Sequence, residues 1–232
     1  MSVPVVSVII PAFNEDRTIG DLIRKVQTAA GSSSVPYEIV VVDDGSSDKT
    51  GIVARSHNVR IVCNGKNRGK GAALRKGFEC ALGDIIVTID ADGSHDPRDI
   101  VKLIRPILNG ADVVLGSRFL DIQGRTTTTR LNFLGNSIIN FLIWLITGKR
   151  ISDSQTGFRA YRKKVLKEIG VSADGFQVET ELTLKVLMNG NDVREVPIAI
   201  KRRAVGTSRL NPLNDGLRIL MVILRAVAEP SH

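Results

Sequence analysis

Aromatic residues are scarce in this chain of 232 residues, at 4%, whereas 43% of the residues are hydrophobic. A chain of this length buries a substantial core, and with so few aromatic rings that core must be mainly aliphatic. The composition favours an α/β protein whose buried strands are rich in Val and Ile. Cysteine is also scarce. Cys63 and Cys80 form no CxxC pair and no zinc-binding spacing, so we expect buried, unreactive thiols and a reducing, cytoplasmic compartment.

Long uninterrupted apolar runs are missing as well. A membrane-spanning helix needs about 20 consecutive apolar residues, and the nearest candidate, 131–147, contains Asn132, Asn136 and Asn140. The N-terminus enters a strand-like run at residues 5–10, so we expect no signal peptide. These features predict a chain that does not cross a membrane.

Positive charge is in excess, with a formal net charge of +8 and a sequence pI of about 9.8. Such a balance indicates an anionic partner, either a phosphorylated substrate, a lipid surface or nucleic acid, although a solvated basic surface would give the same number. Nucleic acid is the least favoured partner, because the basic residues are not interleaved with stacking aromatic rings and no nucleic-acid motif is present.

Strand-like and helical segments alternate regularly along residues 3–117. Continuous Val and Ile runs, without strict alternation, indicate strands that are covered on both faces. We therefore predict a doubly wound, mostly parallel sheet flanked by helices, with one half of the domain at 1–120, a second half of the same domain at 121–210 and an amphipathic helix at 211–232. The predicted strands are 5–10, 37–42, 59–63, 85–90, 112–116 and 193–200, and the predicted helices are 16–30, 48–56, 70–82, 97–109, 131–147, 162–168, 176–188 and 212–228, with a polar loop at 148–160.

Two glycine-rich phosphate-binding signatures are absent. The first strand ends in Pro11-Ala12-Phe13-Asn14-Glu15, which lacks the glycines of a dinucleotide-binding fingerprint. Lys66 and Lys70 each follow a glycine, but neither precedes Ser or Thr, so a Walker P-loop is excluded.

Paired carboxylates stand where two of the predicted strands end. Asp43 and Asp44 follow the second strand, and Asp90 and Asp92 follow the fourth. Ligands of open α/β sheets bind beyond the carboxyl ends of the strands, and residues two apart in extended backbone point to the same side. Asp90 and Asp92 therefore predict a site for a divalent metal, Mg²⁺ or Mn²⁺, although a solvated turn and a helix cap would explain such residues too.

Four motifs, Pro11–Glu15, Val42–Ser46, Asn67–Gly71 and Asp90–Asp92, resemble in this order those of the GT-A fold nucleotide-sugar glycosyltransferases. The resemblance implies that 1–120 is the nucleotide-sugar-binding half and 121–210 the acceptor-binding half of one domain. The resemblance implies that the first two motifs hold the base and ribose of the donor, that the third approaches the donor and that Asp-x-Asp carries the metal. The implied donor-binding residues are Pro11, Ala12, Asn14, Glu15, Asp43, Asp44, Gly45, Gly69, Lys70, Asp90, Ala91 and Asp92.

The second half of the chain is similar to the polyprenyl-phosphate branch, which contains the dolichol-phosphate mannose and glucose synthases. The similar segments are 116–119, 153–159, 195–198 and 203–209. Two features depart from that branch: Ser94 stands where mannose synthases carry glutamine, and many relatives continue into transmembrane helices whereas this sequence ends at His232. We therefore expect either membrane contact without crossing or a soluble acceptor.

The resemblance implies direct attack on the sugar with inversion at the anomeric carbon. A lipid phosphate acceptor is already anionic and needs cationic positioning, for which the candidates are Arg118, Arg130, Arg203, Ser208 and Arg209. A neutral hydroxyl acceptor would instead require a carboxylate base, and Asp153 is the candidate. The predicted catalytic residues are thus Asp92, Asp153 and Arg203. Asp153 could otherwise simply organise its loop.

Two rival functions fit parts of the sequence. The segment from Asp90 to Ser94 also matches the Asp-x-Asp-Gly-Thr/Ser motif of haloacid-dehalogenase-like phosphatases, whose motif normally follows the first strand. A noncatalytic basic protein that binds membrane or nucleic acid is the other rival, and for such a protein Asp90 and Asp92 would be dispensable.

Helix 212–228 is amphipathic, with Arg218 and Arg225 seven residues apart among Leu, Ile, Met and Val. Together with 131–147 it predicts peripheral attachment to the inner face of the membrane. The alternative is that both helices bury the same faces in protein, on each other or in a dimer.

Overall fold

The computed structural model describes residues 5–31, 35–120, 128–201 and 212–228. Its centre is a seven-stranded sheet with the order β3-β2-β1-β4-β6-β5-β7. Six strands run parallel and β6 runs antiparallel to its neighbours β4 and β5, which confirms the predicted fold class. The strands are β1 (Val6–Ala12), β2 (Tyr37–Asp43), β3 (Arg60–Cys63), β4 (Ile85–Thr88), β5 (Val113–Ser117), β6 (Arg159–Arg162) and β7 (Val193–Pro197).

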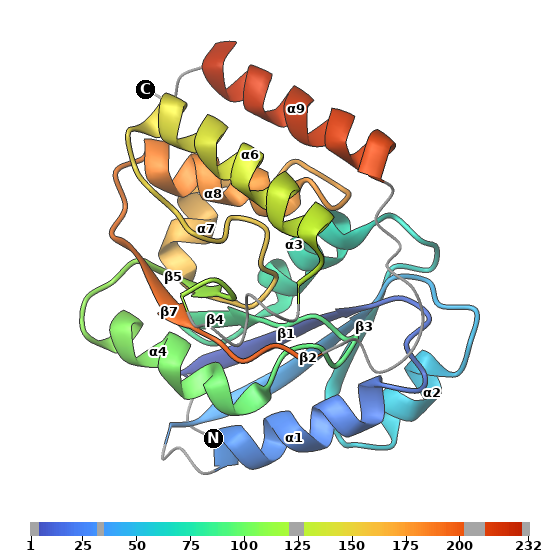
Figure 1. The fold of residues 1–232 in the computed structure, drawn as a ribbon. Helices are drawn as coiled ribbons and strands as arrows, with labels where there is room; N and C mark the ends of the chain where they lie inside the picture. Colours follow the sequence, from blue (N-terminus) through green and yellow to red (C-terminus); the bar gives the residue numbers. More distant parts are fainter. Residues whose placement is uncertain (1–4, 32–34, 121–127, 202–211, 229–232) are drawn as a thin grey trace.

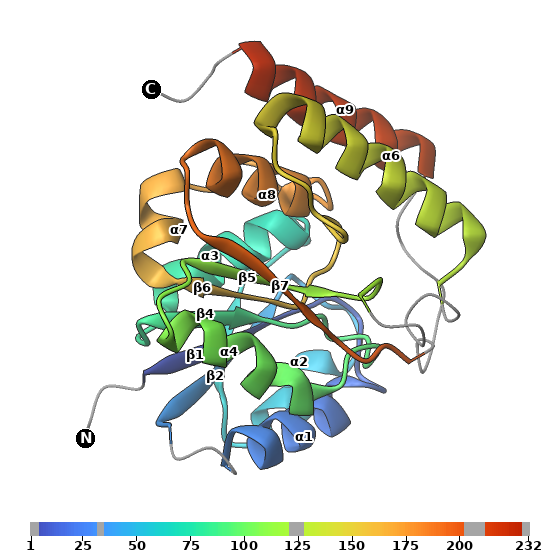
Figure 2. The same cartoon turned by 60° about the vertical axis from the view of Figure 1, so that its left-hand side comes forward.

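Helices cover both faces of the sheet (Figures 1 and 2). In β1, Val8 and Ile10 belong to the core beneath α1, α2 and α4, whereas Ile9 belongs to the core on the opposite face. Both faces are thus apolar, which is why the strands read as continuous Val and Ile runs. The helices are α1 (Ile19–Gly31), α2 (Thr50–Arg55), α3 (Lys70–Cys80), η1 (Pro97–Asp99), α4 (Ile100–Leu108), α6 (Arg130–Thr147), α7 (Lys163–Ile169), α8 (Val178–Met188) and α9 (Pro212–Ala228).

Strand β6 was not predicted, because residues 148–160 read as a polar loop. It has only four residues and carries Arg159 at its start and Arg162 at its end, so no apolar run marks it. Arg159 is nevertheless buried, and its guanidinium donates hydrogen bonds to the carbonyl oxygens of Ser154, Thr156 and Glu179. The strand inserts between β4 and β5, which joins the two halves of the chain in one sheet.

Helices α6 and α9 lie side by side over α8, on the side of the molecule opposite α1 and α2 (Figures 1 and 2). Ile143 of α6 and Ile219 and Ile223 of α9 are buried there. None of the helices in the described ranges is long and apolar enough to cross a membrane.

The prediction of buried cysteines was wrong for Cys63, which is exposed, and Cys80 is only partly buried. Cys63 ends β3, the edge strand of the sheet, whose residues are half-buried or exposed. An apolar neighbourhood in sequence does not bury a residue on an edge strand.

Candidate active site

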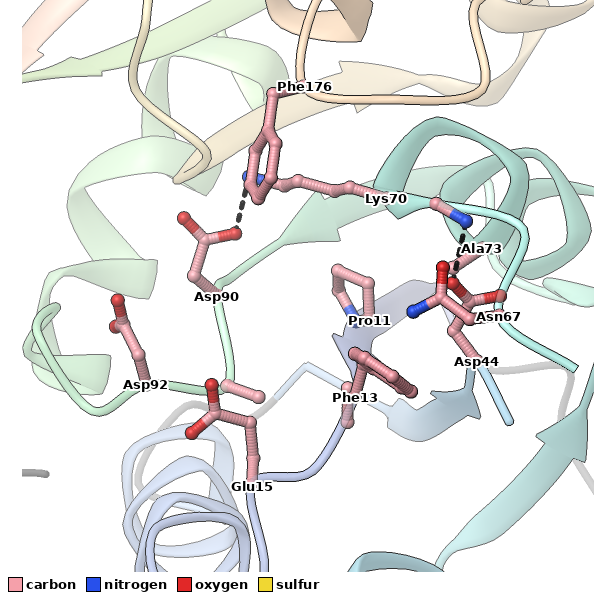
Figure 3. Close-up of a pocket in the computed structure, with 13 residues that line it drawn as sticks. Pro11, Phe13, Glu15, Asp44, Asn67, Lys70, Ala73, Asp90, Asp92 and Phe176 are labelled. Carbon is pink, nitrogen blue, oxygen red and sulfur yellow. Dashed lines mark hydrogen bonds and ion pairs between the residues drawn. The ribbon is translucent and has the colours of Figure 1, made fainter. Parts of the chain in front are cut away.

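The carboxyl ends of β1, β2 and β4 meet at a cleft of about 240 Å³. These strands are parallel neighbours, so the loops that follow them lie at the same edge of the sheet. Figure 3 shows Glu15, Asp90 and Asp92 on one side of the cleft and Asp44 on the other, with Phe13 between them. The lining residues are Pro11, Ala12, Phe13, Glu15, Asp44, Asn67, Gly69, Lys70, Ala73, Asp90, Ala91, Asp92 and Phe176.

Asp90 and Asp92, the predicted metal ligands, both line this cleft. One oxygen of Asp92 accepts a hydrogen bond from the backbone N–H of Ser94 at 2.9 Å. Gly157 packs so closely on Asp90 that a Cβ there would lie 2.4 Å from its carboxylate. Hard carboxylate oxygens suit Mg²⁺ or Mn²⁺. In the described part of the chain no three His, Cys, Asp or Glu side chains gather as a metal site. A cation held by Asp90 and Asp92 would complete its shell with water or phosphate oxygens.

Lys70, the first residue of α3, forms an ion pair with Asp90 at 2.6 Å (Figure 3). It forms a second one with Glu179, also at 2.6 Å. Burial alone would lower the pKa of the Lys70 ammonium, but the two carboxylates more than offset this, and its pKa is raised above the ordinary value. Lys70 is therefore a permanent cation inside the cleft.

Asp44 organises the loop that carries the third motif. Its carboxylate accepts hydrogen bonds from the backbone N–H groups of Arg68 and Gly69 and from the side-chain amide of Asn64. These contacts hold residues 64–69 against the end of β2 and bring Asn67 and Lys70 to the cleft.

Asn14, Asp43 and Gly45 do not line the cleft. The side-chain oxygen of Asn14 accepts hydrogen bonds from the backbone N–H groups of Ser47 and Asp48, and Asp43 accepts one from Ser46. Gly45 has φ of +75°, and a Cβ there would lie 2.4 Å from the Lys66 backbone. These three predicted donor residues shape the turn after β2.

Arg118 and Asp153 form a bidentate ion pair beside the carboxylate pair. The Asp153 carboxylate is fully buried and accepts hydrogen bonds from the Nε, Nη2 and backbone N–H of Arg118. Burial would lower the pKa of Arg118, but Asp153 and then Asp90 offset this, and the pKa is raised. The predicted base thus lies beneath an arginine rather than in the cleft.

The other predicted acceptor residues are dispersed or undescribed. Arg130 is exposed at the first residue of α6, after Thr129, whose hydroxyl caps the helix. Arg203, Ser208 and Arg209 lie outside the described residues.

For four residues at or beside the cleft, no role was predicted from the sequence. Phe13 and Phe176 line the cleft. The sequence feature that could have identified them is that aromatic residues are rare in this chain and that these two stand in loops. Glu179 pairs with Lys70. The sequence does not reveal this role, because a carboxylate in the first turn of α8 is equally well explained by its favourable interaction with the helix dipole. His95 is buried, with Nε2 3.9 Å from Asp90 and a pKa lowered by burial.

Comparison with known proteins gives a consistent picture. Residues 7–170 match the model of glycosyl transferase family 2. The chain is 33% identical to polyprenol monophosphomannose synthase of Mycolicibacterium smegmatis, over 89% of this chain and 81% of that protein. It is 34% identical to dolichol-phosphate mannosyltransferase of Pyrococcus furiosus, over 88% of this chain and 59% of that protein.

A solved structure with the same fold is glucosyl-3-phosphoglycerate synthase of Mycobacterium tuberculosis in complex with Mn²⁺, UDP and glucosyl-3-phosphoglycerate. It is 24% identical, with a TM-score of 0.75, over 98% of this chain and 81% of that one.

The matched segment contains all four motifs, from Pro11 to Asp92. This decides against both rival functions, the phosphatase and the noncatalytic basic protein, and Asp90 and Asp92 follow the fourth strand of the chain rather than the first. The chain belongs to glycosyl transferase family 2, and it is a glycosyltransferase with the GT-A fold.

Proposed function

We propose that this enzyme transfers a hexosyl group from a UDP- or GDP-sugar to a polyprenyl or dolichyl phosphate at the cytoplasmic face of the membrane. The observation that carries the proposal is the position of the Asp90–Asp92 pair. The pair lines the cleft formed by the nucleotide-sugar motifs, and Asp90 is near enough to the Arg118 guanidinium to help raise its pKa. A donor and an anionic acceptor can therefore meet over the two carboxylates.

The donor is held along the cleft. The apolar wall at Pro11, Ala12 and Phe13 suits a base, the loop held by Asp44 suits the ribose, and Lys70 suits the diphosphate. Asp90 and Asp92 would hold the divalent cation. When bound, that cation supplies charge neutralisation for the departing nucleoside diphosphate.

The acceptor is held by arginine rather than activated by a base. Asp153 fixes the Arg118 guanidinium in one orientation, and Arg118 is close enough to Asp90 for the carboxylate to affect its pKa. A phosphate monoester is anionic near pH 7 and needs only orientation. We therefore propose Asp153 as a positioning residue. Arg130, Arg203, Ser208 and Arg209 remain the proposed companions of Arg118.

Helices α6 and α9 supply the proposed membrane surface. Each buries one face against the protein and leaves a row of large apolar side chains in contact with solvent, which is unusual for a water-facing helix. Arg218 and Arg225, also exposed, stand near this row, as expected for a helix in the headgroup region. The exposed apolar residues are Leu131, Phe133, Leu134, Ile138, Phe141, Trp144 and Leu145 of α6 and Leu217, Leu220, Met221, Leu224 and Val227 of α9.

The relatives' names support the lipid acceptor, since both are named for sugar transfer to polyprenol or dolichol phosphates. The structural neighbour, whose complex contains glucosyl-3-phosphoglycerate, represents the alternative of a soluble acceptor.

A transfer assay tests the proposal. The protein is incubated with labelled UDP- or GDP-sugars, Mn²⁺ or Mg²⁺ and vesicles that contain a polyprenyl phosphate. We expect label in the lipid fraction, no transfer in excess EDTA, and a loss of at least about a hundredfold in Asp92→Asn, the size of effect seen when one electrostatic contact to a transition state is removed. Asp84→Asn, an exposed carboxylate before β4, is the control. Full activity in excess chelator, or transfer to soluble acceptors alone, would contradict the proposal.

A further inference from the structure

The ammonium of Lys70 is paired with Asp90, one of the two carboxylates proposed to hold the metal ion. It lies 2.6 Å from Oδ1 of Asp90 and 2.6 Å from Oε1 of Glu179, and its side chain is 14% exposed. Asp90 comes from the end of β4, Lys70 from the start of α3 and Glu179 from the first turn of α8. Lys70 thus links a metal-binding carboxylate to a second carboxylate from a distant part of the chain.

Hydrogen bonds hold both the backbone at Lys70 and the backbone at Glu179 in place. The backbone N–H groups of Gly71 and Ala72 donate to the carbonyl oxygen of Asp174, which ties the start of α3 to the loop before α8. The carbonyl oxygen of Glu179 accepts a hydrogen bond from the buried Arg159. The Lys70 side chain can therefore move its ammonium from Asp90 to another anion while the Lys70 backbone and Glu179 stay in place.

A divalent cation on Asp90 and Asp92 would come close to this ammonium. Two cations that share one carboxylate repel each other, and the repulsion is strong where little water screens it. Metal and Lys70 must therefore compete for Asp90. A nucleoside diphosphate in the cleft changes this balance, because it offers the ammonium another anion.

We propose that Lys70 is a built-in competitor of the metal, which keeps metal affinity low until a nucleoside diphosphate binds. The ammonium then moves from Asp90 to the phosphates and remains paired with Glu179. The inference rests on the proposed function and adds to it a reason why metal and donor bind together. Because coupling between two ligands is reciprocal, Lys70 strengthens the dependence of nucleotide affinity on metal by the same factor.

Binding of Mn²⁺ alone, followed by the electron paramagnetic resonance signal of the free ion, tests this without any activity measurement. The wild type should bind Mn²⁺ weakly, and far more tightly with UDP or GDP present. In Lys70→Met, Mn²⁺ should bind about ten- to a thousandfold more tightly without nucleotide, the range over which one neighbouring charge alters the affinity for a proton. The gain in Mn²⁺ affinity on adding nucleotide should be smaller than in the wild type.

Three further variants serve as controls. Lys76→Met makes the same charge change on α3, where Lys76 contacts the Cys63 carbonyl oxygen, and should bind Mn²⁺ like the wild type. Lys70→Arg keeps a positive charge at this position and should bind Mn²⁺ weakly, as the wild type does. Because Lys70→Met leaves Glu179 buried without its partner, the double variant Lys70→Met/Glu179→Gln removes both charges and should still bind Mn²⁺ more tightly than the wild type.

Unchanged or weaker Mn²⁺ binding in Lys70→Met and in the double variant, with nucleotide-dependent binding intact in the wild type, would overturn this inference alone. If no form binds Mn²⁺ even with nucleotide, the metal-dependent function itself fails, and the inference with it.

Discussion

Asp153 and Arg118 form a pair in which the carboxylate is entirely buried while the guanidinium is partly exposed. The Oδ2 atom of Asp153 lies 2.6 Å from Nε of Arg118, and Oδ1 lies 2.7 Å from Nη2. The backbone N–H groups that hold Ser152 and Asp153 in place donate to Glu195 of β7. The orientation of Arg118 is therefore fixed through two strands and a loop.

Replacing Asp153 tests whether it positions Arg118 or acts as a base. We expect Asp153→Asn to lower the free energy of unfolding by about 3 kcal/mol, because a largely buried guanidinium loses its counter-charge. Asp192→Asn, which removes the exposed pair with Arg194, should cost less than about 1 kcal/mol. Urea denaturation measures both. A general base would behave differently: turnover would collapse while stability stayed the same.

Neutralising Asp44 should weaken donor binding through the loop that it holds. In Asp44→Asn, an amide N–H₂ would face the N–H groups of Arg68 and Gly69, and losing a hydrogen bond to a charged group costs about 1.5–3 kcal/mol. We expect the affinity for UDP or GDP to fall by about tenfold or more, measured by calorimetry. Asp84→Asn should leave it unchanged. Equal affinities in the two variants would remove Asp44 from the donor site.

The pair of Asp96 and Arg98 predicts a pH-dependent contribution to stability. The Arg98 guanidinium, 2.6 Å from the Asp96 carboxylate, lowers the pKa of Asp96 from the ordinary 3.8 to about 2, against the opposing effect of burial. Because the folded-state pKa is the lower one, the stabilisation is fully present above about pH 4 and is lost as pH falls through 2.

The difference in unfolding free energy between wild type and Asp96→Asn should therefore be largest above about pH 4 and should shrink as the pH is lowered toward 2. Asparagine keeps the side-chain oxygen that accepts from the Arg98 backbone N–H, so the comparison isolates the charge. Urea denaturation across this pH range measures it. A difference that stays constant with pH would contradict the assigned pKa shift.

Membrane attachment predicts that exposed leucines on α9 matter more than exposed apolar residues elsewhere. We expect the wild type to sediment with anionic liposomes at low salt. Leu217→Ser/Leu224→Ser should reduce partitioning by at least about tenfold, since each leucine contributes about 1–2 kcal/mol on burial. The matched control is Ile52→Ser/Leu108→Ser, which alters equally exposed residues on α2 and α4. If the intact protein stays in the supernatant, the membrane-facing role is wrong and a soluble acceptor becomes the better proposal.

The sequence by itself determined the order of the strands and helices and the carboxylates at the ends of two strands. Buried parallel strands carry continuous Val and Ile runs, as in residues 39–42 and 85–87, and such a local signal needs no knowledge of partners. The fixed direction of parallel strands then placed the residues that follow β1, β2 and β4 at one edge, where Glu15, Asp44, Asp90 and Asp92 line one cleft.

Tertiary structure alone decided which charges meet. Strand β6 has no apolar run that would mark it in the sequence. Its Arg159 is nevertheless buried, because the guanidinium donates hydrogen bonds to carbonyl oxygens from other segments. The contacts of Lys70 with Glu179 and of Arg118 with Asp153 join residues 109 and 35 positions apart. A charged residue reads alike in sequence whether it faces water or a buried partner, since its burial depends on a counter-charge that only the folded chain supplies.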